Sequence, residues 1–127
     1  MIPTFIRAHE ASAAVTPNRI VAYSDAAASR KVALAAAATA AIMGVSDRLG
    51  ADLGGMCDVT RAGLSAVELG GTVAAGDPLT SDATGRAIKA VPASNTAMRI
   101  VGWADEPGVV GDIIDAWIDP GQFTNPA

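Results

Sequence analysis

Few residues of this chain belong to the types that perform chemistry, and those few occur singly. Its 127 residues include one cysteine, Cys57, and one histidine, His9. A nucleophilic cysteine needs a neighbouring base, so these two residues form the only Cys–His pair that the sequence allows. Cys57 lies within an apolar run, residues 56–60, where a buried and inert thiol is the usual outcome. The sequence therefore predicts no cysteine-based catalysis.

Serines beside aspartates are the next candidates for catalysis. Ser24 precedes Asp25, and Ser81 precedes Asp82. Both pairs stand between predicted strands, where Ser and Asp side chains usually bond the backbone of their own turn. We interpret both pairs as turns. With no other nucleophile and base expected to converge, we predict that the chain is not an enzyme.

Metal, cofactor and nucleotide sites have equally little support. The aspartates follow neither the Asp-x-Asp-x-Asp-Gly calcium loop nor a glycine–aspartate nonapeptide array, and turn or strand-edge roles explain them. The Gly54-Gly55 and Gly70-Gly71 pairs lack the lysine and the strand-to-helix context of a phosphate-binding loop. We therefore expect no metal and no cofactor. The aspartates considered are Asp47, Asp52, Asp58, Asp105, Asp112, Asp115 and Asp119.

Composition argues against two classes of partner. The formal net charge is −4 and the nine basic residues are scattered, whereas direct nucleic-acid binding needs a clustered basic face. No stretch approaches the roughly 20 apolar residues of a membrane span, and the first residues do not read as a signal peptide. We expect one soluble domain, made inside the cell, that binds neither nucleic acid nor membranes.

The most informative feature of the sequence is an internal repeat, over about residues 21–59 and 78–116. Ser24-Asp25-Ala26 recurs as Ser81-Asp82-Ala83, and Ile42-Met43-Gly44 is answered by Ile100-Val101-Gly102. Each copy of such a repeat is one supersecondary unit, whose apolar face is covered by its partner. The repeat therefore predicts a small pseudo-symmetric scaffold.

Short apolar or alternating runs, each bounded by Gly, Pro, Asp or Asn, indicate many short strands. The alanine-rich stretch after Lys31 has good helix formers, but its counterpart in the second copy contains Pro92, which would break a helix. We therefore predict strands over residues 32–34 and 42–45, with a loop or a single helical turn over residues 36–41. The fold class expected is mainly β, a small single-domain β-barrel or sandwich built from two pseudo-repeated β units.

The sequence divides into an N-terminal arm, residues 1–16, a β-rich domain, residues 17–120, and an irregular tail, residues 121–127. Apolar Ile2, Phe5 and Ile6 in the arm indicate a segment that docks, either on its own domain or on a neighbour.

The last strong strand, residues 113–119, has two different faces. Ile114, Ala116 and Ile118 form the predicted core face, which places Trp117 among acids on the other face. A large aromatic there marks either an interface anchor or a cap on the end of its own barrel. Trp103, which replaces Val45 of the first copy, has the same two interpretations.

One longer phrase is distinctive: Ala-Gly-Asp-Pro-Leu-Thr-Ser-Asp over residues 75–82, followed by Gly-Arg-Ala at residues 85–87. Together with residues 31–35, 42–47, 71–74, 100–104 and 111–114, it resembles the small capsid decoration, or cement, proteins of tailed bacteriophages. The resemblance covers about residues 21–121.

This resemblance implies a β-rich homotrimer on the outer surface of the capsid, made in the host cytoplasm. It would bind the major capsid protein and clamp adjoining subunits after the shell expands. It also implies that the arm, with Ile2, Phe5 and Ile6, reaches the shell. Avidity over many weak contacts would suit that task.

The sequence is also compatible with two other functions. One is a different virion module, namely a tail, baseplate or fibre subunit. The other, from a different class, is a small-ligand-binding β-barrel or a hydrolase. Copy number per particle separates the first from a decoration protein, and thermal shift with metabolites tests the second.

Overall fold

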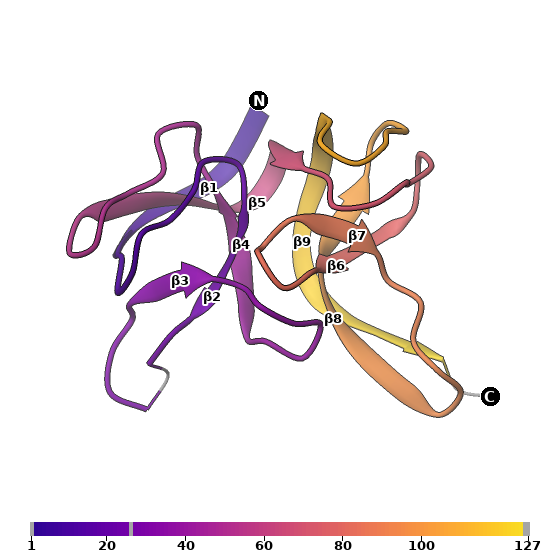
Figure 1. Ribbon diagram of the computed structural model, residues 1–127, viewed down its shortest axis with the longest axis horizontal. Helices are drawn as coiled ribbons and strands as arrows, with labels where there is room; N and C mark the ends of the chain where they lie inside the picture. Colours follow the sequence, from indigo (N-terminus) through magenta and orange to yellow (C-terminus); the bar gives the residue numbers. More distant parts are fainter. Residues whose placement is uncertain (1, 26, 126–127) are drawn as a thin grey trace.

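The computed structural model describes residues 2–25 and 27–125, with the backbone alone described for residues 2–4. Within these residues the chain forms β-strands and turns but no helix, so no described segment could cross a membrane as a helix. The strands (Figure 1) are β1 (Ile2–Glu10), β2 (Ile20–Tyr23), β3 (Val32–Leu34), β4 (Ile42–Ser46), β5 (Met56–Glu68), β6 (Pro78–Ser81), β7 (Ala87–Lys89), β8 (Thr96–Ala104) and β9 (Ile113–Asn125).

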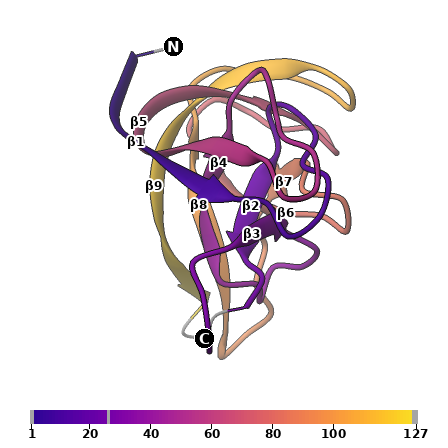
Figure 2. The same ribbon diagram turned by 90° about the vertical axis from the view of Figure 1, so that its left-hand side faces the viewer.

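The strands form one curled antiparallel sheet, which confirms the predicted all-β fold class. Its order is β3-β2-β4-β5-β9-β8-β6-β7, with β1 paired to the other side of β5. The sheet curls so that the short strands β2, β3, β6 and β7 lie to one side and the long strands β5 and β9 form its back (Figure 2). A single small domain results.

The two halves of the sheet have the same strand order when each is followed from its edge to the centre. Strands β2 to β5 occupy one half in the arrangement that β6 to β9 occupy in the other, and β5 and β9 meet at the centre. Register matches as well, because Val21 lies opposite Gly44 and Leu79 lies opposite Gly102. We call these halves the first and second units.

β1 also belongs to the repeat, although we had placed it outside, because its contacts match those of the second half of β5. Isolated bridges join Ala11 to Val32 and Leu69 to Ala87, at corresponding points of the two units. β1 pairs with the first half of β5 as the second half of β5 pairs with β9. Since β5 is shared, its first half ends the first unit and its second half begins the second.

The alanine-rich stretch forms strands and a loop as predicted. β3 covers residues 32–34, β4 begins at Ile42, and bends and turns connect them. The counterpart residues 90–95 are likewise irregular. The helix propensity of alanine is a weak preference, which the sheet pairing of the flanking strands overrides.

Two long strands differ from expectation. β5 runs unbroken through Gly63, although the sequence predicted short strands bounded by such glycines. Gly63 has a φ of 105° that only glycine adopts easily. β9 continues through Pro120 to Asn125, although we had predicted an irregular tail from residue 121. β8 extends to match it and pairs with residues 121–125, whereas Pro120 lies in an irregular stretch without a register partner on β8. The tail residues 126–127 lie outside the described residues.

The core consists of two apolar clusters on opposite faces of β2 and β4. Ile20 and Ile42 face a large cluster shared by both units, whereas Val21 and Met43 face a smaller one in the first unit. The smaller cluster is closed by Ala11 from the segment that follows β1. Each large buried aliphatic side chain contributes about 1.5–3 kcal/mol, so the shared cluster holds the two units together.

The two-faced prediction for the last strand is confirmed. Ile114, Ala116 and Ile118 are buried, at 3%, 0% and 1% exposure, while Ile113 and Trp117 are about half exposed.

Candidate functional site

The predicted interface tryptophans lie directly opposite each other. Trp103 on β8 is the register partner of Trp117 on β9. Trp117 is in turn opposite Leu64 on β5, and Leu64 is opposite Ile2 on β1. Partners in register point to the same face of a sheet. An apolar row therefore crosses the outer face of the sheet, and we call Leu64, Trp103 and Trp117 the outer row.

The outer row is open to solvent. Trp117 is 49% exposed and Trp103 is 36% exposed. Trp103 also packs edge-on against Phe123 of β9, with ring centroids 6.3 Å apart. Exposed aromatic side chains on neighbouring strands of a rigid sheet are typical of a protein-binding surface.

The arm residues belong to a strand rather than to a loose arm. β1 pairs along its length with β5 of the same chain, yet Phe5 and Ile6 remain 51% and 42% exposed. The Arg61 guanidinium lies over the Phe5 ring, 6.0 Å from its centroid. The backbone therefore docks on its own domain, while two predicted contact side chains face outward. The Ile2 side chain lies outside the described residues.

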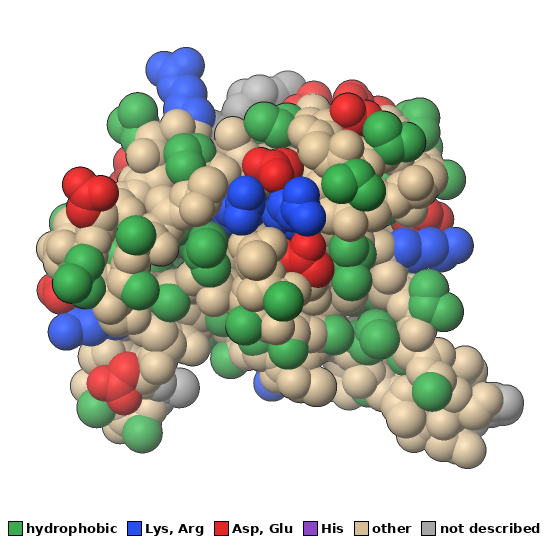
Figure 3. Space-filling view, viewed as in Figure 1, with side chains coloured by type: hydrophobic (Ala, Val, Ile, Leu, Met, Phe, Trp, Pro, Cys, Tyr) green, Lys and Arg blue, Asp and Glu red, His purple; other side chains and the backbone are tan. Residues whose placement is uncertain are grey.

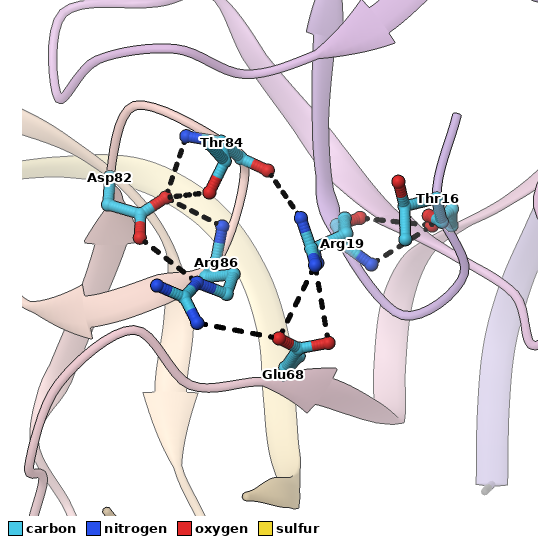
Figure 4. Close-up of polar contacts among 7 residues, drawn as sticks. Thr16, Arg19, Glu68, Asp82, Thr84 and Arg86 are labelled. Atoms are coloured by element: carbon cyan, nitrogen blue, oxygen red, sulfur yellow. Dashed lines mark hydrogen bonds and ion pairs between the residues drawn. The ribbon is translucent and has the colours of Figure 1, made fainter. Parts of the chain in front are cut away.

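A second candidate region is an ionic network at the junction of the two units (Figure 4). Glu68, at the end of β5, lies 3.3 Å from the Arg19 guanidinium and 3.7 Å from that of Arg86. Arg86 also pairs with Asp82 at 3.5 Å, and Arg19 donates to the Thr84 carbonyl at 2.9 Å. The network thus ties the segment before β2 to the β6–β7 turn.

Acidic and basic side chains gather at the centre of the face shown in Figure 3, between the two halves. Burial alone would raise the pKa of Asp82. Hydrogen bonds from the Thr84 and Arg86 amides and the Thr84 hydroxyl, with the Arg86 charge, outweigh it and lower the pKa. Asp82 thus bonds the backbone of its own turn, as we predicted for the Ser81-Asp82 pair, and the same bonds favour its ionised form.

The first unit carries the exposed counterpart of this network. Glu10 corresponds to Glu68 and Lys31 to Arg86, and their charged atoms lie 3.4 Å apart. Their side chains are 47% and 45% exposed, against 22% and 31% for Glu68 and Arg86. None of our sequence-based predictions included this network. Its available signal was the recurrence of a basic residue just before β3 and β7, with a glutamate at the end of β1 and β5.

The structure brings His9 and Cys57 together as register partners on β1 and β5. Both are buried, and burial raises the pKa of the Cys57 thiol to about 11, which disfavours the nucleophilic thiolate. The His9 Nδ1 donates to the Arg30 carbonyl at 2.9 Å, and its ring meets Tyr23 edge-on. The pair therefore has a packing role.

His9 predicts how stability depends on pH. Burial lowers its pKa below the usual 6.5; the Arg30 carbonyl opposes this, and nearby arginines add to it. The unfolded chain therefore binds a proton more readily, and stability present above about pH 6.5 is lost as the pH falls. Urea unfolding at about pH 7.5 and 5.5 measures the loss. His9→Asn keeps a δ-position donor and should flatten this pH dependence; an unchanged slope would contradict the assignment.

The described residues contain no group of three or more His, Cys, Asp or Glu side chains placed to hold a metal ion. The only histidine and cysteine of the sequence are the buried pair above.

No protein-family model and no curated protein matches this sequence. Among solved structures, the fold is similar to the crystal structure of the N base of head fiber gp8.5 in bacteriophage phi29. The TM-score is 0.67 at 22% identity, over 94% of this chain and 95% of that chain. The two proteins therefore share a fold over nearly their whole lengths, and the resemblance to decoration proteins stays a prediction.

Proposed function

We propose that the chain is a structural protein of a phage virion. In this proposal it attaches to the outer surface of the capsid as a homotrimer, binds the major capsid protein and bridges its subunits. The role is one of binding, without catalysis or cofactor. The observation that carries the proposal is the fold similarity to a phage head-fiber base over nearly the whole of both chains.

Two further features support this proposal. The decoration-type phrase spans residues 75–87, which form the loop before β6 and the β6–β7 hairpin. The outer row and Phe5 expose aromatic side chains on a rigid sheet, as a protein-binding surface requires. A trimer would multiply such modest contacts into firm attachment.

A second candidate is the base of a capsid fiber, which the similarity to a head-fiber base favours directly. Both candidate functions place the chain on a virion. They differ in the number of copies per particle and in whether the protein is joined to a shaft. A decoration protein would be present in hundreds of copies and end at its own surface, whereas a fiber base would be sparser and joined to a projecting shaft.

Mass measurement of the purified protein, followed by binding to empty capsids, tests the proposal. We expect a trimer that binds expanded shells but not immature ones. Electron microscopy of the particle then gives the copy number. A strictly monomeric protein that binds neither kind of shell would refute the proposal.

The outer row predicts which residues this binding needs. Trp117→Ser should weaken binding to expanded shells by about tenfold or more, since exposed aromatic anchors carry much of an interface energy. Val110→Ser is the matched control, because Val110 is 58% exposed and lies outside the row. Titration of shells with labelled protein measures both. Equal binding by the two variants would exclude the outer row from the interface.

A further inference from the structure

Within the chain, the first unit docks on the second through the segment just before β2. The Glu68 amide donates to the Asn18 carbonyl at 2.9 Å, and the Ile20 amide donates to the Gly85 carbonyl at 2.7 Å. Arg19 adds its bonds to Thr84 and Glu68. We call residues 18–20 the docking segment, and Glu68 with residues 84–86 the receiving surface.

The first unit has an equivalent receiving surface that no described segment covers in this way. Glu10 corresponds to Glu68, and residues 29–31 correspond to residues 84–86 by the matching strand bridges. A hollow of about 300 Å³ lies there. β1 pairs on one side only among the described residues, so its outer edge is open beside this hollow. The hollow is lined by Arg7, Ala8, His9, Glu10, Ser29, Arg30, Lys31 and Met56.

The second unit carries the equivalent docking segment, residues 76–78. The Ala104 amide donates to the Asp77 carbonyl at 2.8 Å, as the Ser46 amide donates to the Arg19 carbonyl at 2.8 Å. Register places Pro78 opposite Trp103. This segment leads into β6, on the right in Figure 1, whereas the open receiving surface lies beside β1 and β3 on the left. The two surfaces therefore cannot meet within one chain.

We propose that residues 76–78 of one copy dock on the open receiving surface of the next, so that copies join head to tail. The inference rests on the oligomer of the proposed function and assigns its surfaces. The partner is a second copy of this chain, and the contact repeats the one between the two units. A head-to-tail contact closes into a ring or grows into a filament, and the proposed trimer is the closed case.

Sequence differences on the two surfaces are complementary. Pro78 stands where Ile20 lies and has no amide hydrogen to donate. Correspondingly, the Arg30 carbonyl, equivalent to that of Gly85, is already satisfied by His9 Nδ1 at 2.9 Å. Residues 76–78 therefore lack the amide hydrogen that Ile20 donates inside the chain. Its acceptor on the open receiving surface, the Arg30 carbonyl, already has a donor in His9.

The docking segments of the two units carry opposite charges, and the open receiving surface has more basic residues than the covered one. Asp77 replaces Arg19 in the docking segment, and Arg7, Arg30 and Lys31 surround the open receiving surface with Glu10 as its acid. In its own chain, Asp77 Oδ2 accepts a hydrogen bond from the Ala74 amide at 2.8 Å, whereas Oδ1 lies 3.8 Å from the exposed Lys89 ammonium. Arg30 stands where Gly85 lies inside the chain. A Cβ at Gly85 would come within 2.8 Å of the Ile20 carbonyl oxygen, so the contact between copies is wider at this point than the contact between the two units.

Net charge follows the same pattern. Residues 1–59 contain five basic and five acidic residues, whereas residues 60–125 contain four basic and eight acidic residues. A head-to-tail contact sets the acidic unit of one copy beside the neutral unit of the next, which separates the acidic units. Charges arranged in this way favour one orientation of association over the others.

Disulfide trapping tests the contact directly. Inside the chain, a Cβ added at Gly85 would lie 3.4 Å from the Cβ of Arg19, close to the separation of about 3.8 Å in disulfides. The equivalent pair between copies is Arg30 and Asp77. The double variant Arg30→Cys/Asp77→Cys should therefore oxidise to covalent dimers and trimers on a non-reducing gel. Arg48→Cys/Asp77→Cys is the control, and buried Cys57 should stay unreactive.

Charge reversal gives a second measurement that does not depend on trapping. Arg30→Glu should weaken association by about tenfold in sedimentation, and adding Asp77→Lys should recover part of the loss. Arg48→Glu makes the same charge change at an exposed site and should have little effect. If the protein forms oligomers and binds shells but these variants match their controls, the head-to-tail contact is wrong and the proposed function stands. A monomer that still binds shells also overturns the contact.

Discussion

Gly102→Ala is expected to lower the free energy of unfolding by about 3 kcal/mol, the largest single-residue effect that we predict. Gly102 lies on β8 opposite Ile118 of β9. A Cβ at this position would overlap the carbonyl oxygen of Trp117, a backbone atom held in the sheet. Relief would require the β8–β9 pairing to open. Urea unfolding followed by tryptophan fluorescence measures the change.

Gly121→Ala is the matched control, because Gly121 lies in the same strand pair and an added Cβ there would come no closer than 3.9 Å. Its effect should stay within about 0.5 kcal/mol. Gly44, the first-unit counterpart, would overlap the Thr60 carbonyl oxygen in the same way, so Gly44→Ala should resemble Gly102→Ala. If Gly102→Ala is as stable as the control, the close approach of the two strands is wrong.

Glu68→Gln should cost about 2 kcal/mol of unfolding free energy. The change removes the charge that pairs with both Arg19 and Arg86, and the Arg19 side chain is only 16% exposed. A cation that is mostly buried and loses its partner keeps the cost of its own desolvation. The Arg19 Nε is buried and has no partner among the described residues. The Thr84 carbonyl that Arg19 also bonds is a neutral acceptor, so it does not replace the charge of Glu68.

The chain provides its own control in the equivalent pair of the first unit. Glu10 and Lys31 are both nearly half exposed, so Glu10→Gln should change stability by no more than about 0.5 kcal/mol. Unfolding of the two variants in low and high salt compares them, and only Glu68→Gln should retain a large effect in high salt. Equal effects in the two positions would mean that the junction network does not stabilise the contact between units.

Comparing the two copies of the repeat predicted more of the fold than the secondary-structure preferences of single residues did. The alanine stretch before Ile42 has helix-forming residues, and only Pro92 in the second copy indicated a loop there. The core face of β9 was readable because Ile114, Ala116 and Ile118 alternate with polar or exposed residues. Both inferences needed only the spacing of residues along the chain.

The missed features depend on pairing between distant segments. β1 matches the second half of β5 in its contacts but shares with it only Ala8/Ala66 and Glu10/Glu68 in sequence. Pro120 and Gly121 have the composition of a strand end, yet β8 pairs with β9 beyond them. The Glu68 network joins segments 49 positions apart, and no local pattern fixes such a register.

Because β8 extends along the second half of β9, the sheet has no place for a third unit in the same chain. The second half of β5 pairs with β9, the last strand of the second unit. On β9, the corresponding stretch is already occupied by residues 96–100 of β8. A further unit fused after Asn125 would find its place taken by the chain's own hairpin. A third unit could therefore join the sheet in the same chain only if β8 were shorter. Further copies must be added as separate chains.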